Sequence, residues 1–371
     1  MPSTERPLVS VVVPVYNDRD GLGATLASLV EQTYPESSYE VIVVDNGSTD
    51  RTPQLARAVA AGNEVVCVEE ETEIQGSYAA RNAGIRASEG EILAFLDADV
   101  TVEPDWLETA VAWMNDHDAK YVGCRIEIPE PDREPVEPAQ GLVGSAQGLA
   151  GPAQGLVGSV RDLVGRYDAL TGFPVERYVR ENEFAPTCGL LVAREVFDDV
   201  GLFDPGLVSG GDTEFGQRVA DAGYELHYAP ELRVEHPARS SLRSLLGKHV
   251  RVGRGMAQRS RRHPDRYDPP SPWSPRGLLG PHPRRFHRAF GEAWTDLSRP
   301  EKVGMYAVGT LVGYAVTAGR ALEHVGGRGG SAPVTEWVEA EADAGRVKAE
   351  ADVGRDGAEA DVGRGEVEAK S

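Results

Sequence analysis

Hydrophobic residues in the first hundred positions form short runs that polar segments separate. The most apolar runs cover four ranges: residues 8–15, 39–44, 65–68 and 92–96. Runs of this length, rich in β-branched side chains and bounded by turn residues, are typical of strands buried on both faces of a sheet. Between them the pattern predicts three helices. The first covers residues 21–32, the second begins after a cap at Thr49 or Asp50 and ends at about residue 61, and the third covers 77–87. This alternation predicts an α/β fold with a mostly parallel sheet and helices on both faces.

The same pattern continues further along the chain. It predicts two more long strands, a short helix and a longer helix, in this order: residues 120–128, 184–192, 194–200 and about 212–222. Two short strands are expected to follow, over 225–228 and 232–235. We therefore expect one sheet-containing domain over residues 1–237, with a chain long enough to bury a large core.

Acidic residues come directly after two of the predicted strands. Asp45 follows the second, and Asp97 and Asp99 follow the fourth. The carboxyl ends of the strands border the crevice where open α/β sheets bind ligands. Two carboxylates one residue apart can hold Mg²⁺ or Mn²⁺, which prefers oxygen ligands and is commonly shared with substrate phosphates. An isolated Asp-x-Asp is more often a solvated corner, so the neighbouring segments decide its meaning.

Common nucleotide-binding loops are missing from the expected places. No Gly-x-Gly-x-x-Gly follows the first strand, and the chain has no Gly-Lys-Ser/Thr loop. A sugar-phosphate nucleotidyltransferase would need a glycine-rich loop with Arg or Lys after the first strand, where this chain has Tyr16, Asn17 and Asp18. A non-catalytic lipid- or glycan-binding scaffold with the same fold is a second alternative.

Four segments together resemble the family 2 glycosyltransferases, inverting enzymes of the GT-A fold that include haloarchaeal, membrane-associated members. The segments are VSVVVPVYND, VIVVDNGSTDRT, AARNAGIRASEGEILAFLDADV and GGDTEFGQRV. The match covers roughly residues 7–237 in the right order and spacing. The resemblance implies a metal-dependent enzyme that transfers a sugar from a nucleotide-diphospho-sugar to a lipid-linked or glycan acceptor.

The resemblance also implies a donor nucleotide site of six residues: Pro14, Val15, Tyr16, Asp45, Arg81 and Asp97. The first three would line the base pocket, and Asp45 would bind the base or ribose. Arg81 would lie near the donor diphosphate, where a guanidinium can bind two oxygens at once. Asp97 would lie near the sugar or ribose.

By the same resemblance, Asp99 is the main ligand of Mn²⁺ or Mg²⁺, and Asp212 is the general base that deprotonates the acceptor hydroxyl. Many relatives have Glu-Asp where this chain has Gly211 and Asp212, which leaves Glu214 as an alternative base. Some relatives use a histidine at the position of His236 as a further metal ligand. Simple packing of His236 is the alternative.

A variable insertion is expected over residues 129–166, and it contains a repeat of seven residues. The repeat reads AQGLVGS, AQGLAGP, AQGLVGS from Ala139 to Ser159. Each glycine costs about 1 kcal/mol in a helix, so the repeat does not predict a coiled coil. We expect a mobile insertion at the edge of the acceptor cleft.

The chain is strongly acidic, with a formal net charge of −21. Such a surface argues against nucleic-acid binding and fits a protein adapted to high cytoplasmic salt. Its three cysteines are far apart, as expected in a reducing compartment.

The segment 238–300 reverses this charge, since residues 239–288 contain 13 Lys and Arg against two Asp. We interpret it as a surface for anionic lipid or for a phosphate-bearing acceptor. The alternative is a cationic helix that neutralises the acidic domain.

A hydrophobic helix is expected over residues 301–326, with an uncharged run over 303–319 and glycines at 309 and 313. The run is at the lower limit for a membrane span, so a span, an interfacial helix and a packed helix all stay open. Residues 327–371 form an acidic, low-complexity tail that should be disordered. We expect a cytoplasmic protein at the inner face of the cell membrane.

Overall fold

The computed structural model describes residues 6–129, 151–239, 241–268, 271–273, 286, 290–291 and 293–326. Most of the repeat, most of the stretch between residues 269 and 292, and the acidic tail lie outside the described residues. The expectations for the repeat before residue 151 and for the tail therefore stay predictions.

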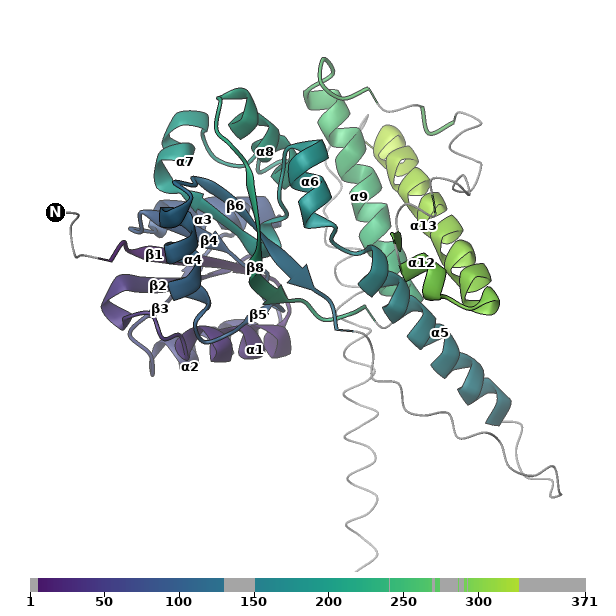
Figure 1. Cartoon of the computed structure of the whole chain (residues 1–371), viewed down its shortest axis with the longest axis horizontal. Helices are drawn as coiled ribbons and strands as arrows, with labels where there is room; N and C mark the ends of the chain where they lie inside the picture. The colour runs from purple at the N-terminus through teal and green to yellow at the C-terminus, as the bar shows by residue number, and fades with distance from the viewer. Residues whose placement is uncertain are drawn as a thin grey trace, which may run out of the picture. The chain divides into compact units, whose positions relative to one another are not determined.

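A single mixed sheet of eight strands organises the described part of the chain (Figure 1). Its strands lie in the order β3 (Val66–Glu70), β2 (Tyr39–Asp45), β1 (Val9–Val15), β4 (Ile92–Phe95), β7 (Leu190–Ala193), β6 (Tyr121–Glu127), β8 (His227–Glu235) and β5 (Thr101–Val102). The first four run parallel to one another, and β6 runs parallel to β8. β7 runs antiparallel to both of its neighbours, β4 and β6, and β5 runs antiparallel to β8. The expected α/β class, with helices on both faces of the sheet, is confirmed.

Helices connect and cover these strands. In chain order they are α1 (Arg19–Val30), α2 (Thr52–Ala60), α3 (Ser77–Ala87), α4 (Trp106–Asp116), α5 (Gly151–Thr171), α6 (Val175–Asn182), α7 (Arg194–Val200), α8 (Gly211–Asp221), α9 (Leu242–Arg262), α12 (Ala293–Asp296) and α13 (Arg299–Gly326). Two short 3-10 turns, η1 (Glu36–Ser38) and η2 (Thr187–Gly189), precede β2 and β7. Because parallel crossovers are right-handed, α1 and α2 lie on one face of the sheet and α3, which leads back across β1, lies on the other.

The core follows the hydrophobic runs of the sequence. Every residue of β1 and β4 is buried, and β2 is buried apart from Glu40. Strands with apolar side chains on both faces can only be stable between two layers of helices, which is why these runs form the centre of the sheet.

One local expectation was wrong, and one copy of the repeat has a regular structure that the sequence did not predict. The two short strands predicted over 225–228 and 232–235 are one strand, β8, whose pairing with β6 has an irregularity between Cys124 and Arg125. The last copy of the repeat, residues 153–159, is helical because it belongs to α5. The low helix propensity of glycine was outweighed there by the helix that continues from it to Thr171.

The basic and the hydrophobic segments form two long helices, α9 and α13, that lie side by side (Figure 1). A Cβ atom at Gly253 of α9 would lie 2.1 Å from the carbonyl oxygen of Val316, and one at Gly319 of α13 would lie 2.0 Å from that of Val250. Small residues thus let the two backbones approach closely. No helix in the described ranges is long and apolar enough to cross a membrane.

Candidate active site

The candidate site lies at the switch point of the sheet, where the strand order reverses. β2 and β3 lie on one side of β1, β4 lies on the other, and all four run parallel. Ligands of open α/β sheets bind outside the carboxyl ends of the strands at such a point. Asp45 pairs with Val15 at the ends of β2 and β1, and Asp97 and Asp99 follow β4. The structure thus brings acids from separate strands to one edge.

Asp45 has a buried acceptor that the described residues do not use. Its Oδ2 accepts a hydrogen bond from the backbone N of Ser48 at 3.2 Å, whereas its buried Oδ1 has no partner within the described residues. An unpaired buried carboxylate oxygen is costly and calls for a missing partner. Pro14 and Val15 are buried at the end of the adjacent strand, and Tyr16 is half-buried. This corner offers an acceptor beside apolar side chains, as a nucleoside requires.

Asn17 fixes the polar turn that follows Asp45. Its Oδ1 accepts hydrogen bonds from the backbone N of Thr49 at 2.7 Å and of Asp50 at 3.3 Å, and its own N donates to Ser48 Oγ at 2.9 Å. Asn17 has a φ of 50°, a left-handed conformation that asparagine tolerates better than most residues. The turn is therefore held against the end of β1 before any ligand binds.

Asp97, Asp99 and His236 form a cluster that can hold a metal ion. One ligand atom from each lies within 4.8 Å of the others, and His236 Nε2 is 3.9 Å from Asp99 Oδ1. Burial raises the pKa of Asp99, and the charge of Asp97 adds to this effect, while His236 and Arg239 oppose it. Two crowded carboxylates and an imidazole suit a divalent cation, which would relieve their repulsion.

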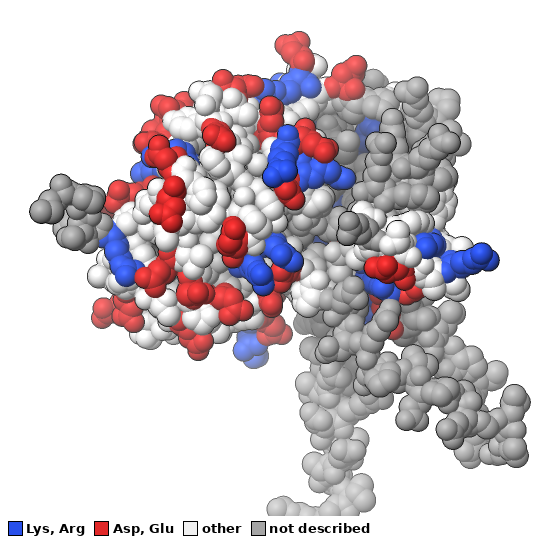
Figure 2. All heavy atoms as spheres, in the orientation of Figure 1, with Lys and Arg blue, Asp and Glu red and all other residues white. Residues whose placement is uncertain are grey.

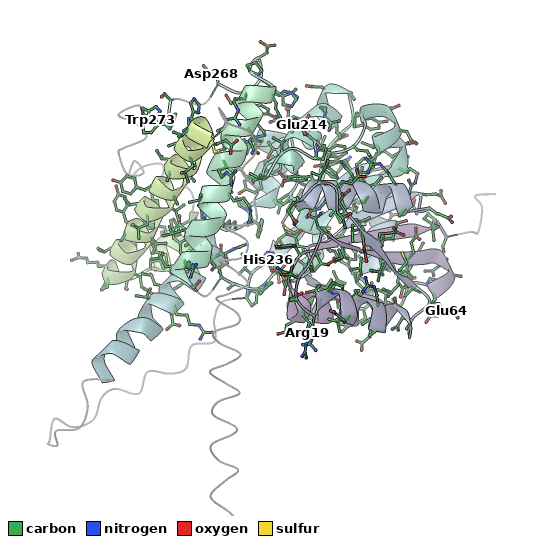
Figure 3. The ribbon with its side chains drawn as sticks, turned by 180° about the vertical axis from the view of Figure 1, so that it is seen from behind. Arg19, Glu64, Glu214, His236, Asp268 and Trp273 are labelled. Atoms are coloured by element: carbon green, nitrogen blue, oxygen red, sulfur yellow. The ribbon has the colours of Figure 1, made fainter. Side chains whose placement is uncertain are left out.

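His236 is oriented as a metal ligand would be. Its Nδ1 lies 2.9 Å from the carbonyl oxygen of Pro237, and a carbonyl can only accept, so Nδ1 carries the proton. With the proton on Nδ1, Nε2 is the ring nitrogen that can bind a cation on the side of Asp99. The ring is buried and contacts Phe173 at a centroid distance of 5.4 Å. Figure 3 labels His236, which directly follows β8.

Arg81 reaches the cluster from α3. The side chain is buried, its Nη2 donates to Asp97 Oδ1, and its guanidinium lies 5.6 Å from the ring centre of Tyr78. The buried Nε has no hydrogen-bond partner within the described ranges. Arg81 is thus a buried cation at the edge of the cluster of Asp97, Asp99 and His236, with donor capacity left over for an anion.

Asp212 lies in the first turn of α8 and faces the same site. Its Oδ1 accepts hydrogen bonds from the backbone N of Thr213 at 2.8 Å and from Tyr78 Oη at 3.3 Å. Burial raises the pKa of Asp212, whereas the Thr213 bond and the charges of Arg81 and Arg259 lower it. A carboxylate with a raised pKa and a free oxygen is suited to accept a proton.

Glu214 is occupied in a different way. It is buried, and its two oxygens accept hydrogen bonds from Arg218 Nε at 2.6 Å and Nη2 at 3.0 Å. The two-pronged pair within α8 makes Glu214 part of the scaffold of the helix. Of the two acids that the sequence left open, Glu214 has both oxygens bound by Arg218, whereas the described hydrogen bonds of Asp212 all fall on Oδ1.

Three polar residues near the site were not predicted: Asp18, Tyr78 and Lys248. Burial raises the pKa of Asp18 to about 6, although its bond to Gly21 N lowers it and the charge of Asp99 raises it further. Burial lowers the pKa of Lys248 to about 8, and Nζ lies 4.7 Å from the ring centre of Phe173. Asp18 belongs to a motif that was visible in the sequence, whereas no local signal connects Tyr78 or Lys248 to the site.

The basic segment is largely paired with acids of the same chain. Arg254 and Arg261 both bind Glu323 of α13, and Arg262 binds Asp204. These pairs favour the alternative that the cationic helix neutralises acidic neighbours, and they use part of the charge expected to face a membrane. Acidic side chains are spread over the face of the sheet region in Figure 2.

A mixed sheet with acids at its switch point, a cluster that can hold a cation and a half-buried carboxylate close by are typical of enzymes that bind a nucleotide and transfer a group from it. The model of the family described as Glycosyl transferase family 2 matches residues 10–158. Glycosyltransferase AglE of Haloferax volcanii is 38% identical over 252 residues, which cover 68% of this chain and 74% of the relative. The chain therefore belongs to glycosyltransferase family 2, and it is an enzyme that uses nucleotide-sugar donors.

Two further comparisons agree with this assignment. The pre-mycofactocin glycosyltransferase of Mycobacterium tuberculosis is 29% identical over 269 residues, which cover 70% of this chain and 49% of that relative. The mannosyltransferase PcManGT from Pyrobaculum calidifontis, solved with GDP-Man and Mn²⁺, matches with a TM-score of 0.53 at 22% identity. The match covers 85% of this chain and 88% of the mannosyltransferase, and it supports the GT-A fold.

Proposed function

We propose that this enzyme is an inverting, metal-dependent glycosyltransferase that transfers a sugar from a nucleotide-diphospho-sugar to a lipid-linked or glycan acceptor of a cell-surface or protein glycosylation pathway. The observation that carries the proposal is the cluster of Asp97, Asp99 and His236, with ligand atoms within 4.8 Å of one another. The cluster suits Mn²⁺ or Mg²⁺, and the related fold of PcManGT was solved with Mn²⁺. A bound cation would supply positive charge for the departing nucleoside diphosphate.

The roles of the protein side chains follow from their positions. Asp45 accepts a hydrogen bond from the nucleoside beside Pro14, Val15 and Tyr16. Arg81 pairs with diphosphate oxygens through donors that Asp97 does not use. Asp212 takes the proton of the acceptor hydroxyl as this attacks the anomeric carbon in line with the leaving group, and a single attack inverts the configuration. Glu214, the other acid in the first turn of α8, is held by Arg218 and keeps no oxygen for this role.

A test of this proposal is donor turnover. The purified chain in high KCl would be given a panel of nucleotide sugars with Mn²⁺, with Mg²⁺ or with EDTA, and polyprenyl phosphate or a native lipid extract as acceptor. We expect one donor to release nucleoside diphosphate only when metal is present, and NMR of the product to show inversion at the anomeric carbon. Turnover that is unchanged in EDTA would refute the metal dependence, and retention would refute the single attack.

We also propose that the enzyme works at the inner face of the cell membrane. The face of α13 that points away from α9 is apolar and exposed, and it includes Val303, Leu311, Tyr314 and Leu322. Lys302 lies in the first turn of α13, near the end of this face where a cation can pair with a lipid phosphate. The expected partner is an anionic lipid surface on which α13 lies in the plane of the interface.

Vesicle sedimentation tests this placement. We expect the chain to bind vesicles that contain anionic lipid, and the double variant Leu311→Gln/Leu322→Gln to lose about 10-fold or more in affinity, since each change exposes a polar group to the acyl region. The matched control is Arg243→Gln, which changes an exposed charge on α9 and leaves the α13 face intact. Equal binding by the double variant and the wild type would exclude α13 as the contact.

A further inference from the structure

One arginine of α9 differs from its neighbours in how it is paired. Arg254, Arg261 and Arg262 each form an ion pair with an acid of the chain. Arg259 is half-buried, and its Nε and Nη1 atoms are buried without a hydrogen-bond partner among the described residues. A buried, charged donor without a partner costs roughly 1–3 kcal/mol or more, so its presence asks for a compensating role.

The position of Arg259 is next to the base. Its guanidinium lies over Gly210, where a Cβ would be 3.0 Å from Nε, and Gly210 is two residues before Asp212. Gly210 has a φ of +79°, a left-handed conformation that also favours glycine. The charge of Arg259 is close enough to lower the pKa of Asp212. The guanidinium carbon also lies over the ring of Tyr267, 4.8 Å from its centre.

The helix that carries Arg259 is fixed against the loop that leads into α8, the helix of Asp212. Gln258 Oε1 accepts a hydrogen bond from the backbone N of Val208 at 2.9 Å. A Cβ at Gly255 would lie 2.2 Å from the carbonyl oxygen of Ser209, so the two backbones are in close contact. Arg262 and Asp204 join the same two elements at 3.1 Å. Arg259 is therefore held beside the base rather than free in solvent. Figure 3 labels Glu214 of α8, and His263, just after α9, lies 4.0 Å from it.

Within the described part of the chain, Arg259 forms no ion pair with an acid, although its charge acts on nearby Asp212. Residues 210 and 211 are both glycine, and Glu214 is taken by Arg218. A planar guanidinium matches the two oxygens of a carboxylate or phosphate, which is the pairing that Arg favours. A ligand that brings such a group to the base would supply the missing partner.

We propose that Arg259 binds an anionic oxygen group of the acceptor and thereby holds the acceptor hydroxyl at Asp212. The group is the carboxylate of an acidic sugar or the phosphate of a lipid-linked acceptor. The inference rests on the proposed function for the identity of the base, and it adds a preference for negatively charged acceptors. In the proposed function the donor is bound by other groups, which are Asp45, Arg81 and the cation held by the cluster of Asp97, Asp99 and His236.

The test is equilibrium binding of four probes to the full chain in high KCl with saturating Mn²⁺. The probes form two pairs that differ in charge: methyl glucuronide with methyl glucoside, and a short polyprenyl phosphate with its alcohol. The variants are Arg259→Gln and Arg259→Lys, with Arg243→Gln as the control on the same helix. Calorimetry gives the dissociation constants, and the melting temperature of each variant shows whether it is folded.

We expect the wild type to bind one anionic probe about 10-fold or more tightly than its neutral twin, as one charged hydrogen-bonded contact supplies. Arg259→Gln should reduce this ratio to about 1, Arg259→Lys should keep part of it, and Arg243→Gln should keep all of it. The pair that shows the preference distinguishes a carboxylate from a phosphate.

Three outcomes would overturn the inference. They are a wild type without preference for either anion, an Arg259→Gln variant that keeps the preference, and a variant that loses affinity equally for charged and neutral probes. The binding measurement needs no turnover, so it can succeed when the donor assay fails. In that case the Arg259 inference would stand, and only the proposed transfer chemistry would be rejected. In a working transfer assay, Arg259→Gln should raise KM for the acceptor more than it lowers kcat.

Discussion

Arg218 holds Glu214 with two hydrogen bonds, from Nε at 2.6 Å and from Nη2 at 3.0 Å. The same guanidinium donates to the carbonyl oxygen of Leu202 at 2.7 Å, so it joins α8 to the preceding loop. Asp212, two residues before Glu214, accepts all three of its described hydrogen bonds on Oδ1, from Tyr78 Oη and from N and Oγ1 of Thr213. Two acids in the first turn of one helix therefore have different tasks, one structural and one at the site.

Replacement of each acid by its amide should distinguish the two roles. Asp212→Asn should lower kcat by about 100-fold or more, because the amide cannot accept the proton, and should leave the melting temperature nearly unchanged. Glu214→Gln should lower the free energy of unfolding by about 3 kcal/mol, because it breaks a largely buried ion pair. Turnover and thermal melting of both variants check this. Full activity of Asp212→Asn together with an inactive but stable Glu214→Gln would reverse the assignment.

Removal of a metal ligand should weaken Mn²⁺ binding. Asp99→Asn and His236→Ala should each raise the dissociation constant for Mn²⁺ by about 10-fold or more, because each removes one of the three side chains expected to bind the ion. Asp99→Asn also removes a negative charge that attracts the cation. Electron paramagnetic resonance or calorimetry measures this without a substrate. His227→Ala is the control, because His227 lies against Trp113 at a centroid distance of 5.9 Å and is outside the cluster. Unchanged affinity in both ligand variants would exclude this cluster as the cation site.

Asp18 should make the metal-free protein less stable above about pH 6. Its pKa in the folded protein is about 6, against an ordinary value of 3.8, chiefly because of burial. The folded state therefore binds more protons than the unfolded chain between these values, and stability is lost as pH rises through this window. Asp18→Asn keeps the side-chain acceptor that caps α1 through Gly21 N and removes the charge.

With EDTA present, we expect Asp18→Asn to raise the free energy of unfolding by about 1 kcal/mol at pH 8 and by nearly nothing at about pH 4, a value reduced for partial solvent exposure. Denaturant titrations at both pH values measure this. A stabilisation of equal size at both pH values would show that the effect does not come from the charge of Asp18.

The close crossing of α9 and α13 should depend on its glycines. Gly319→Ala places a methyl group 2.0 Å from the carbonyl oxygen of Val250, so the helices must separate, and we expect a loss of about 1–3 kcal/mol in the free energy of unfolding. Gly313→Ala on the same helix meets no atom within 4 Å and should instead stabilise by up to about 1 kcal/mol, because alanine favours the helix. Thermal melting of the two variants checks the opposite signs, and equal effects would mean that the helices do not touch there.

The sequence by itself determined the central strands and their acids. Runs such as residues 8–15 and 92–96 are apolar at every position, and only a strand between two helical layers can bury both of its faces. The length of each run fixed where the strand ends, so the positions of Asp45, Asp97 and Asp99 at one sheet edge followed directly. The predicted helix over 77–87 was confirmed residue for residue.

Only the tertiary structure decided which charged side chains from distant segments contact one another, because the local sequence pattern does not encode these contacts. The basic segment was visible in the sequence, but only the folded chain pairs Arg254 and Arg261 with Glu323 and leaves Arg259 beside Asp212. The same holds for His236, whose proton on Nδ1 is set by the Pro237 carbonyl and whose Nε2 meets Asp99. Hydrophobic periodicity determines which face of an element is buried, whereas the meeting of charged side chains from distant elements depends on how the helices cross.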